Sequence, residues 1–261
     1  MSALTPIDPT GARILITNDD GVHAPGIRVL EEIARTLSDD VWTVAPETEQ
    51  SATSHSLTVR RPLRLRQLEP RRHSVDGTPT DSVVVATAKV LADRKPDLVL
   101  SGINLGSNLA EDVTYSGTVA AAMEAALLGL PSIALSLNRR GDHDFRWQTP
   151  KAHAARVIRQ ICAAGFGPDT LVNVNFPDVE PDDVRGVRVV RQGRRDVQTE
   201  VVEGKDPGGR PYVWIGDYMR DDGMSDDTDL AAIAEGYVSV TPLHLDLTAR
   251  DLMASLSEAF D

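Results

Sequence analysis

The chain has 261 residues, of which 41% are hydrophobic and 25% charged, the ordinary composition of a folded globular protein. This composition excludes intrinsic disorder, a collagen-like fibre and a disulfide scaffold, and the length suits one large domain or two small ones. A net charge of −12 and an aromatic content of 4% argue against a nucleic acid polymer as the partner. A small phosphorylated ligand is not excluded, because one local site can be positive within an acidic protein.

The single cysteine and the hydropathy pattern bear on location. Cys162 cannot form an internal disulfide, and it falls in an apolar helical pattern that predicts a buried side chain. Residues 1–11 lack the pattern of a secretory signal, and no apolar run approaches the roughly 18–20 residues of a membrane span. We therefore expect a cytoplasmic protein with no membrane partner.

Short apolar runs alternate with helical periodicity over the first two thirds of the chain. In chain order the pattern predicts a strand at 13–17, a helix over 27–37, a strand at 41–45, a helix over 80–92, a strand at 97–101, a helix over 116–128, a strand at 132–137, a helix over 150–164 and a strand at 171–175. Continuous apolar strands that alternate with helices predict an α/β fold, with a Rossmann-like, mostly parallel sheet and helices on both faces.

The last third differs in pattern. It contains a predicted strand at 186–191, two strands at 197–202 and 212–215 that flank a Gly/Pro turn, a strand at 237–241 and an amphipathic helix over 249–260. We predict one domain over residues 1–261, with a core at about 12–180. The C-terminal extension, at about 181–261, contributes a hairpin and a helix.

Two clusters of charge stand out. Residues 60–73 carry six arginines, which we interpret as a solvated edge strand and loop in preference to a phosphate-attracting rim. Residues 221–229 carry five aspartates without the ligand spacing of a calcium loop, and we interpret most of this stretch as a solvated loop.

Polar side chains follow three of the predicted strands. Asp19 and Asp20 come directly after the first strand, Ser51 lies in the long loop after the second, and Asn104 lies in the glycine-rich loop after residue 101. Ligands of open parallel sheets bind beyond the carboxyl ends of the strands. Carboxylate, hydroxyl and amide oxygens suit Mg²⁺, Mn²⁺ or Ca²⁺. Asp19, Asp20 and Gly21 alone could equally form a capping turn, and we give His23 and His55 supporting or structural roles.

Ser116, Gly117 and Thr118 open a predicted helix, whose first N–H groups could bind an anion or could simply be capped by Ser or Thr. A metal that faces a helix N-terminus is an arrangement suited to hydrolysis of phosphate esters. The chain has no P-loop and no G-x-G-x-x-G pattern, which disfavours an NTPase or a Rossmann dehydrogenase.

The chain resembles the SurE family, stationary-phase survival proteins that act as metal-dependent 5′/3′-nucleotidases. The matching segments are residues 14–26 (ILITNDDGVHAPG), 44–46 with Ser51, 77–81 (GTPTD), 101–104 (SGIN), Asn108, 112–124 (DVTYSGTVAAAME) and 235–248 (EGYVSVTPLHLDLT). They follow one another in order over almost the whole chain.

The resemblance implies one divalent ion per subunit, Mg²⁺ or Mn²⁺, held by Asp19, Asp20, Ser51 and Asn104. It implies hydrolysis of nucleoside 5′- and 3′-monophosphates, with short polyphosphate as a further substrate. It also implies a homodimer or homotetramer in which the C-terminal hairpin and helix take part in subunit contacts.

We therefore expect a phosphomonoesterase in which Asp19 or Asp20 also orients or deprotonates the attacking water. The phosphate-binding residues are expected to be Asn18, Asn108, Ser116, Gly117 and Thr118. Glu47 and Glu49 depart from many SurE sequences, which carry basic residues here, and would repel a phosphate if they faced the site. The alternatives are an enzyme acting mainly on short polyphosphate and a non-catalytic oligomer that binds metal or nucleotide.

Overall fold

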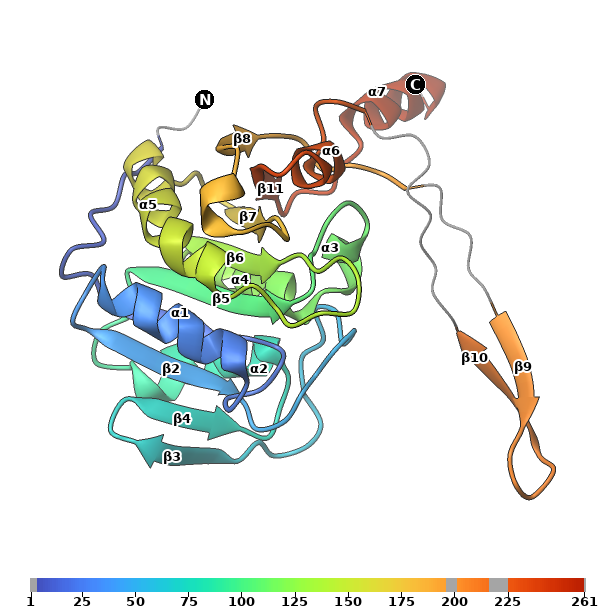
Figure 1. The fold of residues 1–261 in the computed structure, drawn as a ribbon, viewed down its shortest axis with the longest axis horizontal. Coiled ribbons are helices and arrows are strands. Elements are labelled where there is room, and N and C mark those ends of the chain that lie inside the picture. Colours follow the sequence, from blue (N-terminus) through green and yellow to red (C-terminus); the bar gives the residue numbers. More distant parts are fainter. Residues whose placement is uncertain (1–3, 196–200, 216–224, 261) are drawn as a thin grey trace.

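The computed structural model describes residues 4–195, 201–215 and 225–260. A nine-stranded sheet forms its centre, in the order β3–β4–β2–β1–β5–β6–β7–β11–β8 (Figure 1). Its strands are β1 (Ile14–Thr17), β2 (Val41–Pro46), β3 (Leu65–Glu69), β4 (Arg72–Val75), β5 (Leu98–Leu105), β6 (Ser132–Leu137), β7 (Thr170–Phe176), β8 (Val187–Val189) and β11 (Val238–His244). Neighbours are parallel except where β3 meets β4 and β7 meets β11, so the mostly parallel sheet is confirmed.

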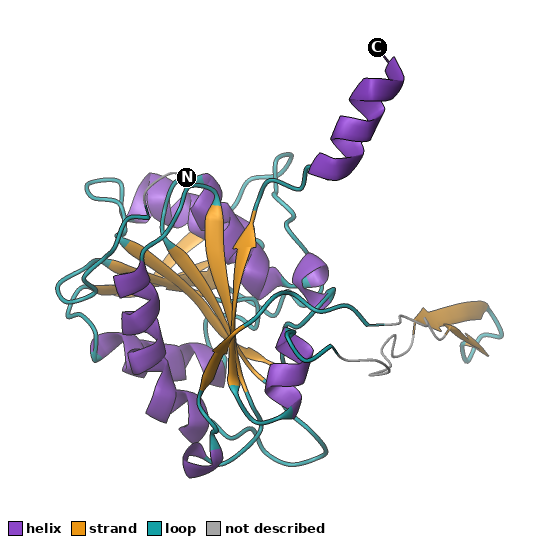
Figure 2. Ribbon diagram, turned by 90° about the horizontal axis from the view of Figure 1, so that it is seen from above, coloured by secondary structure: helices purple, strands orange, loops and turns teal. Residues whose placement is uncertain are grey.

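Helices cover both faces of this sheet, as the sequence predicts (Figure 2). The helices of the chain are α1 (Pro25–Arg35), α2 (Pro79–Val85), α3 (Asp112–Tyr115), α4 (Gly117–Leu127), α5 (Gln148–Ala164), α6 (Asp229–Ala234) and α7 (Arg250–Phe260). Helix α7 has no buried residue and projects away from the sheet. Helices α1 and α5 pack together with one apolar cluster, whereas α2 and α4 pack with another.

The first strand explains why the apolar runs are continuous. Ile14 and Ile16 pack in the cluster beneath α1 and α5, and Leu15 packs in the cluster beneath α2 and α4. All three side chains are fully buried, because successive residues of a strand point to opposite faces and both faces are covered.

Several elements differ from the prediction in length. Strand β5 runs on to Leu105, with a register shift between Ser101 and Asn104, so that the expected glycine-rich loop is partly strand. The helix expected over 80–92 is divided into α2 and a π-helical turn, Ala86–Val90, and α3 was not predicted. Strands β8 and β11 join the central sheet, so residues beyond 180 supply part of the sheet as well as the hairpin and α7.

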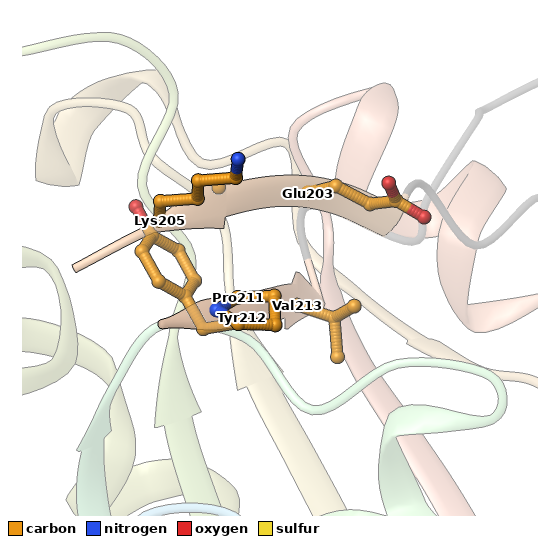
Figure 3. A pocket seen from close by; sticks show the side chains of 6 residues that line it. Glu203, Lys205, Pro211, Tyr212 and Val213 are labelled. Atoms are coloured by element: carbon orange, nitrogen blue, oxygen red, sulfur yellow. The ribbon is translucent and has the colours of Figure 1, made fainter. Parts of the chain in front are cut away.

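The hairpin of β9 (Val201–Lys205) and β10 (Pro211–Ile215) stands away from the body of the molecule (Figure 1). The expected start of its first strand, residues 197–200, lies outside the described residues. Gly204 lies opposite Tyr212, and a Cβ on this glycine would come within 2.5 Å of the Tyr212 ring, which crosses to β9 (Figure 3). A hollow of about 700 Å³ lies on this hairpin alone.

The arginine cluster lies mostly on the exposed edge strand β3 and its loops, as predicted, but Arg72 is half-buried on β4, inside the sheet. Five of these arginines form ion pairs with carboxylates: Arg61, Arg64, Arg66, Arg71 and Arg72. Cys162 is fully buried, as expected, and burial raises the pKa of its thiol to about 11.

The aspartate stretch is only partly a solvated loop. Asp226 and Asp227 are exposed, and Asp221 and Asp222 lie outside the described residues. Asp229, in contrast, is fully buried and accepts hydrogen bonds from the backbone N–H groups of Ala110, Gly193 and Leu230. Within the described part of the chain, no helix has the length and apolar character needed to cross a membrane.

Candidate active site

The candidate site lies at the carboxyl ends of β1 and β5. The chain leaves β1 for β2 on one side and later returns to β5 on the other, so a crevice opens where the strand order reverses. A cavity of about 350 Å³ lies there. Its lining consists of Asp19, Asp20, Glu49, Ser51, Ala52, Asn104, Leu105, Ser107, Asn108, Asp112, Tyr115 and Ser116. The structure thus brings together all four expected metal ligands.

Asp19 is almost completely buried at the end of β1. Its Oδ1 accepts a hydrogen bond from the Thr118 hydroxyl, and its backbone carbonyl accepts one from the backbone N–H of Gln50 at 2.8 Å. Burial raises the pKa of Asp19, while the hydroxyl and backbone N–H of Thr118 oppose the rise by hydrogen bonding to the carboxylate. The first turn of α4 therefore donates hydrogen bonds to the Asp19 carboxylate.

Asp20 joins the end of β1 to the end of β5, since its Oδ2 accepts a hydrogen bond from the backbone N–H of Leu105 at 3.2 Å. Burial and then the neighbouring charge of Asp19 raise the pKa of Asp20 to about 7. Neither carboxylate has a Lys, Arg or His partner among the residues that the structure describes. Two such carboxylates side by side are costly unless a cation is bound between them.

Ser51 and Asn104 complete the oxygen set. The Ser51 hydroxyl donates to Glu49 Oε1 at 2.7 Å, and the Asn104 amide nitrogen donates to the Gly106 carbonyl at 2.9 Å. The hydroxyl proton of Ser51 and one amide proton of Asn104 are used in these bonds, and the side-chain oxygen of each residue is left as a possible ligand. Glu49 lines the cavity, whereas Glu47 pairs with Arg66 on β3, so Glu49 alone of the two faces the site.

The chemistry of this set fits a hard divalent cation. The described residues contain no group of three or more His, Cys, Asp or Glu placed to hold a metal, so a cation here would also need neutral oxygen ligands. Asp19, Asp20, Ser51 and Asn104 supply two carboxylates, a hydroxyl and an amide around one cavity.

Of the expected phosphate-binding residues, Asn108 and Ser116 line the cavity. Ser116 caps α4, because its hydroxyl accepts the backbone N–H of Val119 at 3.1 Å. Asn18, Gly117 and Thr118 are not among the lining residues, and Thr118 and Gly117 contact Asp19 instead. Asn18 donates to the Gly21 carbonyl at 2.9 Å, and a Cβ on Gly117 would come within 2.8 Å of the Asp19 Cβ.

Asn108 is held by polar residues that sequence analysis missed. Its amide nitrogen donates to the Ser136 hydroxyl and its backbone N–H to Asn175 Oδ1, both at 2.8 Å. Its carbonyl accepts from Asn173 and Asn175. Asn173 and Asn175 alternate with valine in an otherwise apolar run, so they share one face of β7, and this spacing was the available signal.

Sequence comparison identifies the family. The family model described as "Survival protein SurE" matches residues 14–199. The chain belongs to the SurE family. A protein of Paramagnetospirillum magneticum described as "5'-nucleotidase SurE" is 57% identical, with 97% of each chain covered. One of the same description from Erythrobacter litoralis is 54% identical over 95% of this chain and 100% of its own.

A solved structure agrees with the SurE fold. The crystal structure of SurE protein from Aquifex aeolicus superposes with a TM-score of 0.84 at 41% identity, covering 97% of this chain and 100% of the other. The likeness extends beyond the segment matched by the family model, so it includes the C-terminal third.

Proposed function

We propose that this SurE protein is a metal-dependent phosphomonoesterase that converts nucleoside 5′-monophosphates, and also 3′-monophosphates, to nucleoside and phosphate. The observation that carries the proposal is the pair of adjacent carboxylates at the switch point of the sheet, Asp19 buried and Asp20 half-buried, with no cationic partner among the described residues. Relatives at 57% and 54% identity that are described as 5′-nucleotidases support the substrate class.

Asp19, Asp20, Ser51 and Asn104 would hold one Mg²⁺ or Mn²⁺ ion. When bound, the ion polarises a phosphoryl oxygen and lowers the pKa of a bound water. Thr118 holds Asp19 in place through its hydroxyl, and Leu105 holds Asp20 through its backbone N–H. Either carboxylate lies at the cavity surface, where it could accept a proton from the attacking water.

Asn108 and Ser116 would bind the phosphate from the opposite wall. Asn108 is fixed by Ser136, Asn173 and Asn175, so its position is set before substrate arrives. In this proposal Asn18, Gly117 and Thr118 contribute through the placement of Asp19 rather than through direct contact.

The deciding experiment is release of inorganic phosphate from a panel of 5′- and 3′-nucleoside monophosphates with Mn²⁺ or Mg²⁺, with EDTA as the control. We expect release that EDTA abolishes and that added metal restores. Short polyphosphate belongs in the same panel, because faster turnover of polyphosphate would support that alternative. Tight nucleotide binding by folded protein without phosphate release would support a non-catalytic role.

We also propose that the protein is a homodimer or homotetramer whose contacts include the hairpin and α7. Two-stranded hairpins are marginal in isolation, and this one exposes large apolar side chains. Trp214 is 68% exposed, Ile215 70% and Phe260, at the end of α7, 88%. A second copy of the chain that covers these surfaces would account for their composition.

Replacing Trp214 with glutamate is expected to lower the oligomeric state, because a charge would be placed within the contact. Size-exclusion chromatography with light scattering measures the mass. Leu68→Glu, on the exposed edge strand β3, is the matched control and should leave the mass unchanged. An unchanged mass for Trp214→Glu would remove the hairpin from the contact.

A further inference from the structure

One wall of the cavity is formed by residues 108–112, which run into the first residue of α3. Asn108 and Asp112 line the cavity, and the residues between them are buried or half-buried. Ala110 has a φ of 52°, a left-handed backbone conformation that alanine adopts rarely. Contacts from elsewhere in the chain must therefore hold this wall in place.

Those contacts come from the two segments that flank the hairpin in sequence. From the segment that precedes the hairpin, the Gln192 amide donates to the Ala110 carbonyl at 2.7 Å. From the segment that follows the hairpin, Asp229 Oδ2 accepts a hydrogen bond from the backbone N–H of Ala110 at 2.9 Å. The same buried aspartate accepts the backbone N–H of Gly193, so the two segments are also joined to each other.

Arg195 supplies the charge at this junction. Its side chain is 5% exposed, and its guanidinium nitrogens lie 3.1 Å from both oxygens of Asp112. The guanidinium also lies 3.2 Å from Glu111 Oε1 and donates to the Leu109 carbonyl at 3.2 Å. A buried arginine in a fork to a carboxylate fixes that carboxylate in position as well as in charge.

The charge matters because the cavity is acidic. Four carboxylates line it, those of Asp19, Asp20, Glu49 and Asp112, and none of the residues that line it is a Lys or Arg. The proposed metal would offset Asp19 and Asp20, but Glu49 and Asp112 would still repel a phosphate ester. Arg195 compensates Asp112 from behind the wall, outside the cavity lining.

We propose that Arg195 is a positioning residue for phosphate-ester binding, which neutralises Asp112 and fixes residues 108–112 as a wall of the site. This inference rests on the proposed function. It places a determinant of substrate affinity on the segment that precedes the hairpin in the sequence.

The test uses the full-length protein and four variants: Arg195→Met, Arg195→Lys, the double variant Arg195→Met/Asp112→Asn, and Arg191→Met. Arg191 is the control, because it forms an exposed ion pair with Asp227 on the same segment. KM and kcat are measured on a nucleoside 5′-monophosphate with Mn²⁺, and thermal unfolding reports folding.

For Arg195→Met we expect KM to rise by about tenfold or more while kcat changes by less than about threefold, since an uncompensated carboxylate repels the bound anion. Arg195→Lys should recover part of the affinity. The double variant should return KM to within about threefold of the parent value, because it removes the uncompensated charge that lines the cavity, whereas Glu111 does not line it. For Arg191→Met, KM and kcat should equal those of the parent protein.

If Arg195 only stabilised the fold, the kinetic results would differ from these. If folded Arg195→Met lost kcat at constant KM, or if the double variant kept the raised KM, the inference would be wrong. Should the parent protein release no phosphate from any nucleotide, the proposed function fails, and calorimetric binding of inorganic phosphate to the same proteins decides the role of Arg195. Absence of phosphate binding by the parent protein would overturn the inference as well.

Discussion

Asp19→Asn is expected to reduce metal-dependent phosphate release by about a hundredfold or more, because the metal supplies several kcal/mol of stabilisation to the transition state. Asparagine keeps the shape of the side chain and still accepts the Thr118 hydroxyl, but it removes the charge. Burial raises the pKa of Asp19, so the charge is unfavourable in the metal-free protein. Unfolding without metal should therefore occur at the same temperature as in the parent, or at a higher one.

Two measurements separate loss of the site from loss of the fold. Phosphate release is measured with saturating Mn²⁺, and thermal unfolding is measured with EDTA and with Mn²⁺. Mn²⁺ should raise the unfolding temperature of the parent and raise that of Asp19→Asn much less. A ligand that binds the folded state more weakly stabilises it less at the same concentration. Asp182→Asn, at an exposed position, is the control. Full activity in folded Asp19→Asn would remove Asp19 from the site.

The metal-free protein is expected to lose stability as Asp20 ionises. Burial and the charge of Asp19 raise the pKa of Asp20 from 3.8 to about 7 in the folded protein. The neutral carboxyl thus favours the folded state, and this contribution is complete below about pH 4 and lost as the pH rises through 7. The full shift corresponds to at most about 4 kcal/mol of unfolding free energy.

Comparison with Asp20→Asn isolates this effect from the other titrating groups. Urea unfolding is measured in EDTA from pH 4 to 8. The free energy of unfolding of Asp20→Asn should increase relative to that of the parent as the pH rises to 7, and the difference should stay constant above pH 7. For the parent, Mn²⁺ affinity should rise as the pH approaches 7 and then level off, because proton and metal compete for Asp20. A stability difference independent of pH would contradict the assignment.

The sequence determined the layers of the fold and the location of the chemistry. Strand β1 could be predicted because its apolar residues are continuous, as burial on both faces requires. Asp19, Asp20, Ser51 and Asn104 could be assembled from sequence because the carboxyl ends of parallel strands meet at one edge of a sheet. The family resemblance then implied a metal held by these four residues, and the structure places all four on one cavity.

Only the tertiary structure decided what each polar group contacts. Thr118 was expected to bind phosphate, but its hydroxyl is used by Asp19, a residue 99 positions away in the chain. Arg195 and Asp112 carry no local signal of their pairing, since 83 residues separate them. Periodicity reports which face of an element is buried, whereas hydrogen bonds and ion pairs depend on distances between elements, which are fixed only when the sheet and its helices pack.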